Sequence, residues 1–175
     1  MQHPPQSKEE IKLALHSVFE DLADYLSTLS EVDFIKPYQE KWSDAEHLAH
    51  LIMSAFPVAN GLKQNKFIFR VFGTAKNGSR TFDKLEEAYK ERLAAGQRAD
   101  AKRTPSSKDI TTKEQMLANW NTILQKLEER IEGWSESDLD KYRVPHPALG
   151  KITMREMLFF TVFHSEHHLD ILKQR

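Results

Sequence analysis

The chain has 175 residues, of which 39% are hydrophobic and 29% charged, which predicts one folded domain over residues 1–175 rather than a disordered chain. The formal net charge of −1 gives no overall basic field, so we expect no nucleic-acid partner, and the absence of cysteine excludes disulfides and thiolate metal sites. No apolar run approaches the roughly 18 residues of a membrane-spanning helix, and the first ten residues lack the apolar region of a signal peptide. We therefore expect a cytoplasmic protein with no membrane partner.

The first half of the chain predicts two long amphipathic helices. Over residues 7–29, apolar side chains recur at steps of three and four. A second helix is predicted over residues 43–72, where Ser43 and Glu46 form a capping box. Pro57 lies inside this helix and is expected to kink it, because proline removes one backbone hydrogen bond.

The second half predicts two more long helices. One covers residues 112–132 and stops at Gly133, and the other covers residues 153–173 and starts with a second capping box. Four amphipathic helices in a chain of this size indicate an all-α fold, a four-helix bundle.

The connection between the second and third helices, residues 73–112, is too long for a structureless loop. Its segment FDKLEEAYKERLAA, residues 82–95, predicts an extra helix, and the charged segment 96–109 that follows is expected to be mobile. The insertion could cover the mouth of the bundle and set substrate choice, or be a solvated appendage. The composition of its charged end favours the appendage.

The connection before the last helix, residues 143–151, contains Pro145 and Pro147. These prolines disfavour helical backbone in the residues before them, so they predict an extended path into the last helix.

The segment FHSEHHLDIL, residues 163–172, places three histidines in the last predicted helix. His164 and His168 are four residues apart, so they share one helix face, which is also the apolar face. His167 lies roughly 100° away, near the edge of that face. A single inward histidine is more often a packed core residue, but two adjacent imidazoles need partners that an apolar core does not offer. A metal ion satisfies both.

The second predicted helix offers a third ligand, either His47 or His50. Periodicity does not choose between them, because both flank the face that carries Leu51, Ser54 and Val58. Three histidines from two helices would leave positions open for water or substrate, as in catalytic metal sites. Sharper metal motifs are absent: no glutamate has a histidine three residues later, and HSEHH fits neither H-E-x-x-H nor H-x-x-E-H.

Two segments resemble a known family. In KWSDAEHLAHL, residues 41–51, a tryptophan is followed by serine and, eight residues after the tryptophan, by a histidine and an apolar residue. In residues 146–172, the order is His-Pro, a glycine, a threonine that starts the last helix, and then two histidines separated by three residues. This order is similar to that of the DinB/YfiT-like superfamily, bacterial four-helix bundles with a three-histidine metal site.

The resemblance implies that His50, His164 and His168 are the metal ligands. It leaves His47 as a neighbour of the site or a packed polar residue, with the packed residue favoured. His16, His146 and His167 are then non-ligands, although His146 could reach the mouth of the site from its loop.

The resemblance also implies an activity. The superfamily includes transferases and isomerases that use bacillithiol, mycothiol or glutathione, and proteins described as metal-dependent hydrolases. We therefore expect a divalent metal (Zn, Ni or Fe) that activates a low-molecular-weight thiol or a water for attack on a small electrophilic substrate. The residues point to the metal, and only the resemblance points to the thiol. The alternative is a non-catalytic, metal-binding or dimerising stress-related bundle, and a homodimer is one expected state.

Overall fold

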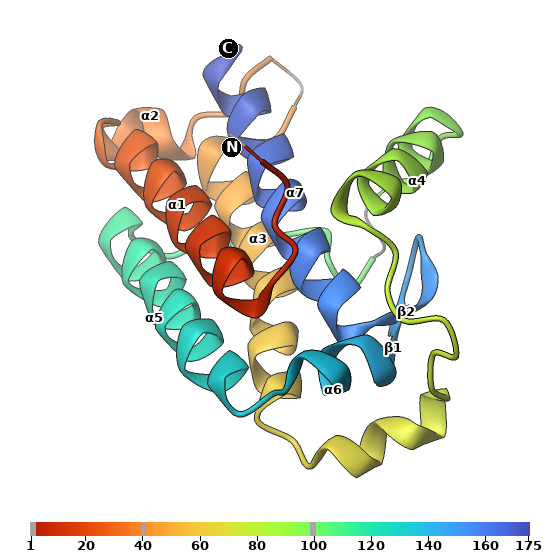
Figure 1. Ribbon diagram of the computed structural model, residues 1–175. Helices are drawn as coiled ribbons and strands as arrows, with labels where there is room; N and C mark the ends of the chain where they lie inside the picture. Colours follow the sequence, from red (N-terminus) through yellow and green to blue (C-terminus); the bar gives the residue numbers. More distant parts are fainter. Residues whose placement is uncertain (1–2, 40, 99–100) are drawn as a thin grey trace.

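Four long helices form the body of the protein in a computed structural model that describes residues 3–39, 41–98 and 101–175. They are α1 (Lys8–Ser27), α3 (Asp44–Leu62), α5 (Lys113–Glu132) and α7 (Met154–Lys173). Helices α1 and α3 each contact both α5 and α7, so the four surround one apolar core (Figure 1). This arrangement confirms the predicted all-α four-helix bundle.

Local capping explains where the bundle helices begin. The Ser43 hydroxyl accepts a hydrogen bond from the backbone N–H of Glu46 (3.2 Å), and the Glu46 carboxylate accepts one from the backbone N–H of Ser43 (2.7 Å). Thr153 and Glu156 make the same pair of bonds at the start of α7. Both predicted capping boxes are present, and each provides partners for N–H groups that a helix leaves unpaired at its first turn.

The second predicted helix ends earlier than expected. Helix α3 stops at Leu62, and a separate 3-10 helix, η1 (Lys66–Phe72), follows. The indole N–H of Trp134 donates to the Leu62 carbonyl (2.9 Å), and the Asn65 side chain accepts from a backbone N–H of η1 (3.0 Å). These bonds supply the partners that let one helix end and the next begin. Pro57 lies inside α3 without ending it.

Helix α4 (Phe82–Ala94) confirms the extra helix predicted in the long connection, and it lies against α7 (Figure 1). The ring of Phe82 meets those of Phe159 and Phe163 edge-on, with centroids 5.6 Å apart in both pairs. Tyr89 meets Phe160 edge-on at 5.1 Å. Aromatic pairs of this geometry anchor α4 to the bundle.

A short antiparallel hairpin leads into α7. Strands β1 (Arg143–His146) and β2 (Gly150–Thr153) pair with Pro145 opposite Lys151, so the predicted extended path is confirmed. Gly150 has a φ of 72°, which glycine adopts without strain. Because β2 ends at the residue that caps α7, the hairpin sets where α7 begins.

The remaining elements are short, and the sequence pattern did not predict them. They are α2 (Glu31–Ile35), η2 (Ser107–Asp109) and α6 (Glu136–Lys141). None of the helices in the described ranges is both long and apolar enough to cross a membrane.

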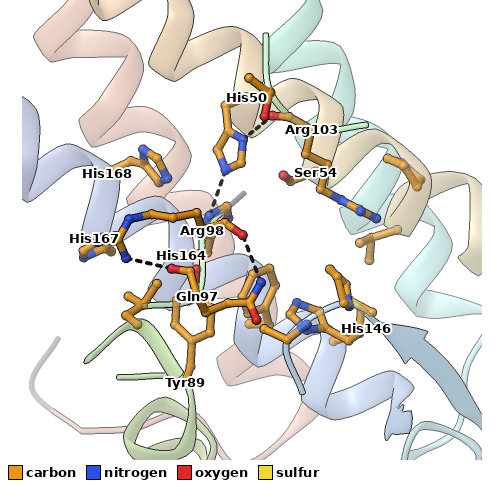
Figure 2. A pocket seen from close by; sticks show the side chains of 18 of the residues that line it. His50, Ser54, Tyr89, Gln97, Arg98, Arg103, His146, His164, His167 and His168 are labelled. Carbon is orange, nitrogen blue, oxygen red and sulfur yellow. Dashed lines mark hydrogen bonds between the residues drawn. The ribbon is translucent and has the colours of Figure 1, made fainter. Parts of the chain in front are cut away.

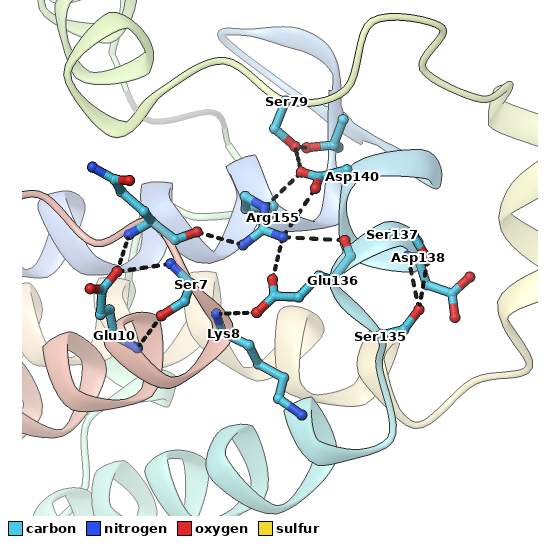
Figure 3. Close-up of polar contacts among 12 residues, drawn as sticks. Ser7, Lys8, Glu10, Ser79, Ser135, Glu136, Ser137, Asp138, Asp140 and Arg155 are labelled. Carbon is cyan, nitrogen blue, oxygen red and sulfur yellow. Dashed lines mark hydrogen bonds and ion pairs between the residues drawn. The ribbon is translucent and has the colours of Figure 1, made fainter.

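Buried Arg155 joins three segments at the start of α7 (Figure 3). Its guanidinium pairs with Asp140 (2.6 Å) and Glu136, and it donates to the Gln6 carbonyl (2.9 Å). These contacts hold α6 and the N-terminal segment against the first turn of α7. They therefore help to fix the axial position of α7, and with it the position of the histidines further along the helix.

Candidate metal centre

Three histidines from two helices meet inside the bundle (Figure 2). His50 on α3 and His164 and His168 on α7 each offer one ring nitrogen, and these nitrogens all lie within 4.8 Å of one another. The Nε2 atoms of His50 and His164 are 3.2 Å apart. The three residues are only 5%, 4% and 7% exposed, respectively. The structure brings the predicted ligands together, and metal binding by them stays a prediction.

The geometry of α7 explains which of its histidines face inward. His164 and His168 are one turn apart on the buried face, which packs against α1 and α3. His167 is exposed at the edge of that face, as its position in the helical period predicted.

A backbone carbonyl fixes the protonation of His50. Its Nδ1 lies 2.7 Å from the carbonyl oxygen of Arg103, which can only accept a hydrogen bond. The ring therefore carries a proton on Nδ1, and Nε2, which faces His164, is the nitrogen it can offer to a metal.

This bond also corrects the expectation that the charged end of the insertion is a solvated appendage. Arg103 belongs to segment 96–109, and the described part of that segment reaches the histidines. The predicted mobility of this segment falls partly on residues 99 and 100, which lie outside the described residues. Composition could not show this contact, because the bond uses a backbone atom.

His47 lies directly behind His168. Their Nδ1 atoms are 2.7 Å apart, and His47 is 6% exposed, with Trp42 edge-on to its ring at 5.5 Å. If His168 offers Nε2 to a metal, its Nδ1–H donates to His47, which orients the ligand ring in the way that second partners of metal-bound histidines do. His47 is therefore both packed and a neighbour of the site.

Burial keeps the imidazoles of His164 and His168 neutral. It is the largest cause of their lowered pKa values, which lie well below the ordinary value of 6.5. Repulsion from neighbouring histidines lowers both pKa values further. Burial also lowers the pKa of His47 to about 3. Neutral imidazole is the form that binds metal. The neutral imidazoles of His164 and His168, together with His50, which a carbonyl already orients, are a donor set that fits a divalent ion such as Zn, Ni or Fe.

His146 lies at the same site but outside the three-histidine group. Its Nδ1 accepts hydrogen bonds from the backbone N–H groups of Ala148 (3.2 Å) and Leu149 (3.1 Å), so its proton is on Nε2. Its ring meets Phe160 edge-on at 4.2 Å, and Phe160 stacks on His164 with centroids 4.7 Å apart. His146 lines the cavity beside the site, in agreement with the prediction that it could reach the mouth from its loop.

A cavity of about 650 Å³ opens beside the three histidines. The hairpin supplies His146, and the insertion supplies Tyr89, Gln97, Arg98 and Arg103. The insertion residues were missed from sequence, because no local pattern shows which side chains of an inserted helix and its following loop fold back over a site.

Comparison with protein families matches the DinB superfamily over residues 14–172 of this chain. Comparison with curated proteins finds no match.

Three solved structures have the same fold. TT2238, described as a four-helix bundle protein, is 16% identical with a TM-score of 0.61, and the match covers 97% of this chain and 100% of that one. YfiT from Bacillus subtilis is 17% identical with a TM-score of 0.55, and the match covers 98% of this chain and 90% of that one. It is described as a probable metal-dependent hydrolase with an unusual four-helix bundle topology. At these identities the likeness shows the fold alone.

The third structure corrects the expectation of no nucleic-acid partner. The colibactin self-resistance protein ClbS, solved in complex with a dsDNA, is 20% identical with a TM-score of 0.59, over 98% of both chains. Nucleic-acid binding is therefore possible in this fold, and the exclusion was wrong. The argument from charge failed because the net charge of −1 is a sum over the whole chain. Such a sum does not show whether cations gather at one place on the surface.

Proposed function

Since the chain belongs to the DinB superfamily, we propose that it is a metal-dependent enzyme in which His50, His164 and His168 hold a divalent ion beside a substrate cavity. The observation that carries the proposal is the buried group of three imidazoles whose nitrogens lie within 4.8 Å of one another, since burial also holds the pKa of His164 and of His168 well below 6.5. Its position supports catalysis over a closed structural site, because the group lies at the wall of a cavity of about 650 Å³.

A divalent ion on three neutral ligands keeps its full charge, and it would lower the pKa of a water or thiol or polarise a carbonyl. The surrounding residues have separate tasks. The Arg103 carbonyl orients the His50 ring so that Nε2 faces the site, and His47 would orient His168 in the same way once His168 offers its Nε2 to the metal. Phe160, stacked on His164, excludes water from one side of the group.

The reaction we propose is attack on a small electrophilic substrate by water or by a low-molecular-weight thiol. The description of YfiT as a probable metal-dependent hydrolase supports water, and the known activities of the superfamily support the thiol. Among the described residues that line the cavity there is no carboxylate, so no acidic general base is assigned.

Metal content is the first test. The purified protein, as isolated and after chelation and reconstitution with Zn, Ni or Fe(II), would be analysed by elemental mass spectrometry. We expect one metal per chain in the wild type and in a His16→Ala control on the exposed face of α1, and none in a His164→Ala, His168→Ala variant. Wild-type protein without metal even after reconstitution would refute the proposal.

Activity is the second test. Hydrolysis of an activated ester and transfer of glutathione to an aromatic halide would be measured with and without a chelator. We expect one of the two activities to be lost on chelation and restored by metal. Protein that binds metal but shows neither activity would favour the non-catalytic bundle.

A further inference from the structure

The cavity beside the histidines has an apolar wall and a cationic rim. Leu93, Val58, Met157 and Phe160 contribute to the wall. Arg98 and Arg103 stand at the rim, and the described part of the lining contains no aspartate or glutamate. An apolar wall binds the apolar part of a ligand, and guanidinium groups bind carboxylate, sulfonate or phosphate groups.

Arg98 is held at the rim by its own neighbour. Its Nη1 donates to the Gln97 carbonyl (3.0 Å), and the Gln97 side chain donates to the Arg98 carbonyl (3.0 Å). Figure 2 shows the Arg98 side chain extending across the site toward His167. Within the described ranges Arg98 makes no ion pair with a carboxylate, although its guanidinium has donors left over.

The second arginine also belongs to this cavity. Arg103 lines it together with the three histidines, and its backbone carbonyl is hydrogen-bonded to His50. A divalent ion bound by the histidines would add positive charge to the same cavity.

Ser54 lies one turn after His50 on α3 and lines the same cavity. Its hydroxyl oxygen is buried and has no hydrogen-bond partner among the described residues.

We propose that this cavity binds a small amphipathic anion, with its apolar body against the wall and its acidic group on Arg98. The inference rests on the proposed function for the identity of the site, and it narrows the substrate or thiol cofactor to molecules that carry a carboxylate, sulfonate or phosphate. A concave cavity with a largely apolar wall fits such a molecule better than the phosphate backbone of a nucleic acid, which needs an extended cationic surface.

A matched pair of fluorescent probes tests this selection. The anion 8-anilinonaphthalene-1-sulfonate and the neutral N-phenyl-1-naphthylamine share one ring system, and their affinities would be measured by fluorescence titration. The titrations would use the protein as purified and after chelator treatment, so that failure to bind metal and failure to bind the anion give different results.

The variants are Arg98→Gln, Arg98→Lys and, as a control, Arg92→Gln. Arg92 lies on the same insertion but lines a different cavity. We expect Arg98→Gln to weaken binding of the sulfonate about twofold to fivefold, because Arg98 is exposed and an exposed ion pair contributes little. Binding of the neutral probe should be unchanged, Arg98→Lys should keep most of the affinity, and Arg92→Gln should match the wild type for both probes.

Two outcomes would overturn the proposal. One is that Arg98→Gln leaves sulfonate binding unchanged or weakens both probes equally. The other is that a dsDNA oligonucleotide displaces the sulfonate, which would assign the cationic rim to a nucleic-acid backbone. Circular dichroism of each variant would confirm that the helices are intact.

Discussion

Replacing His47 by leucine tests whether this buried residue orients a metal ligand. Leucine is similar in size and apolar, so it fills the space beside Trp42 but cannot accept the hydrogen bond that joins the Nδ1 atoms of His47 and His168 (2.7 Å). We expect His47→Leu to fold normally and to bind metal more weakly.

The size of the effect follows from burial. His168 is 7% exposed, so its Nδ1–H would lose its acceptor in a place that water hardly reaches. A buried donor left without a partner costs about 1–3 kcal/mol. Since about 1.4 kcal/mol corresponds to a factor of ten, we expect metal affinity to fall by about 10-fold to 100-fold, the range measured for second partners of ligands in other proteins.

The assay is a competitive titration of the chelated protein with Zn²⁺ against a chromophoric chelator at neutral pH. His47→Asn places an amide near the former position of Nδ1 and should recover much of the affinity. His167→Leu is the matched control, because His167 also neighbours His168 (ring centroids 5.6 Å apart) but is exposed. Equal affinity of His47→Leu and the wild type, or equal losses in His47→Leu and His167→Leu, would refute the reasoning.

Two further predictions concern stability. Arg155→Met removes a buried cation from two carboxylates that are themselves partly exposed, so the free energy of unfolding of metal-free protein in urea should fall by about 2 kcal/mol. Lys12→Met breaks a more exposed pair and should cost less than about 1 kcal/mol. A loss below about 1 kcal/mol in Arg155→Met would contradict this account. The second prediction is that metal-free protein loses stability as pH falls below 6.5. Because burial lowers the pKa of His47 from 6.5 to about 3, the unfolded chain binds a proton in this window that the folded chain does not. Each such histidine then contributes about 1.4 kcal/mol per pH unit, full stability is present above pH 6.5, and His47→Leu should reduce the slope. A flat profile between pH 7.5 and 5.5 would count against it.

Local patterns predicted the long helices well because the forces that start and orient a helix act between residues close in sequence. Ser43 and Glu46 of the capping box are three positions apart, and the apolar residues of α1, α5 and α7 recur at steps of three and four. The end of α3 was predicted wrongly because its partner is distant. Leu62 receives its hydrogen bond from Trp134, 72 residues later, and no local signal shows that bond.

The short elements were missed for another reason. Helices of five or six residues, such as α2 and α6, are too short for a periodic signal to develop, and the β1–β2 hairpin showed only as an extended path between prolines.

The sequence by itself determined the bundle and the pairing of His164 with His168, because both follow from helical periodicity along one segment. Periodicity left His47 and His50 open as the third histidine, and only the packing of α3 on α7 separates them: His50 Nε2 lies 3.2 Å from His164, whereas His47 lies behind His168. The tertiary structure also decided the composition of the cavity. Arg98 lines the cavity and the Arg103 carbonyl bonds to His50 in a segment that follows α4, and α4 is held on α7 by aromatic contacts between residues far apart in the chain.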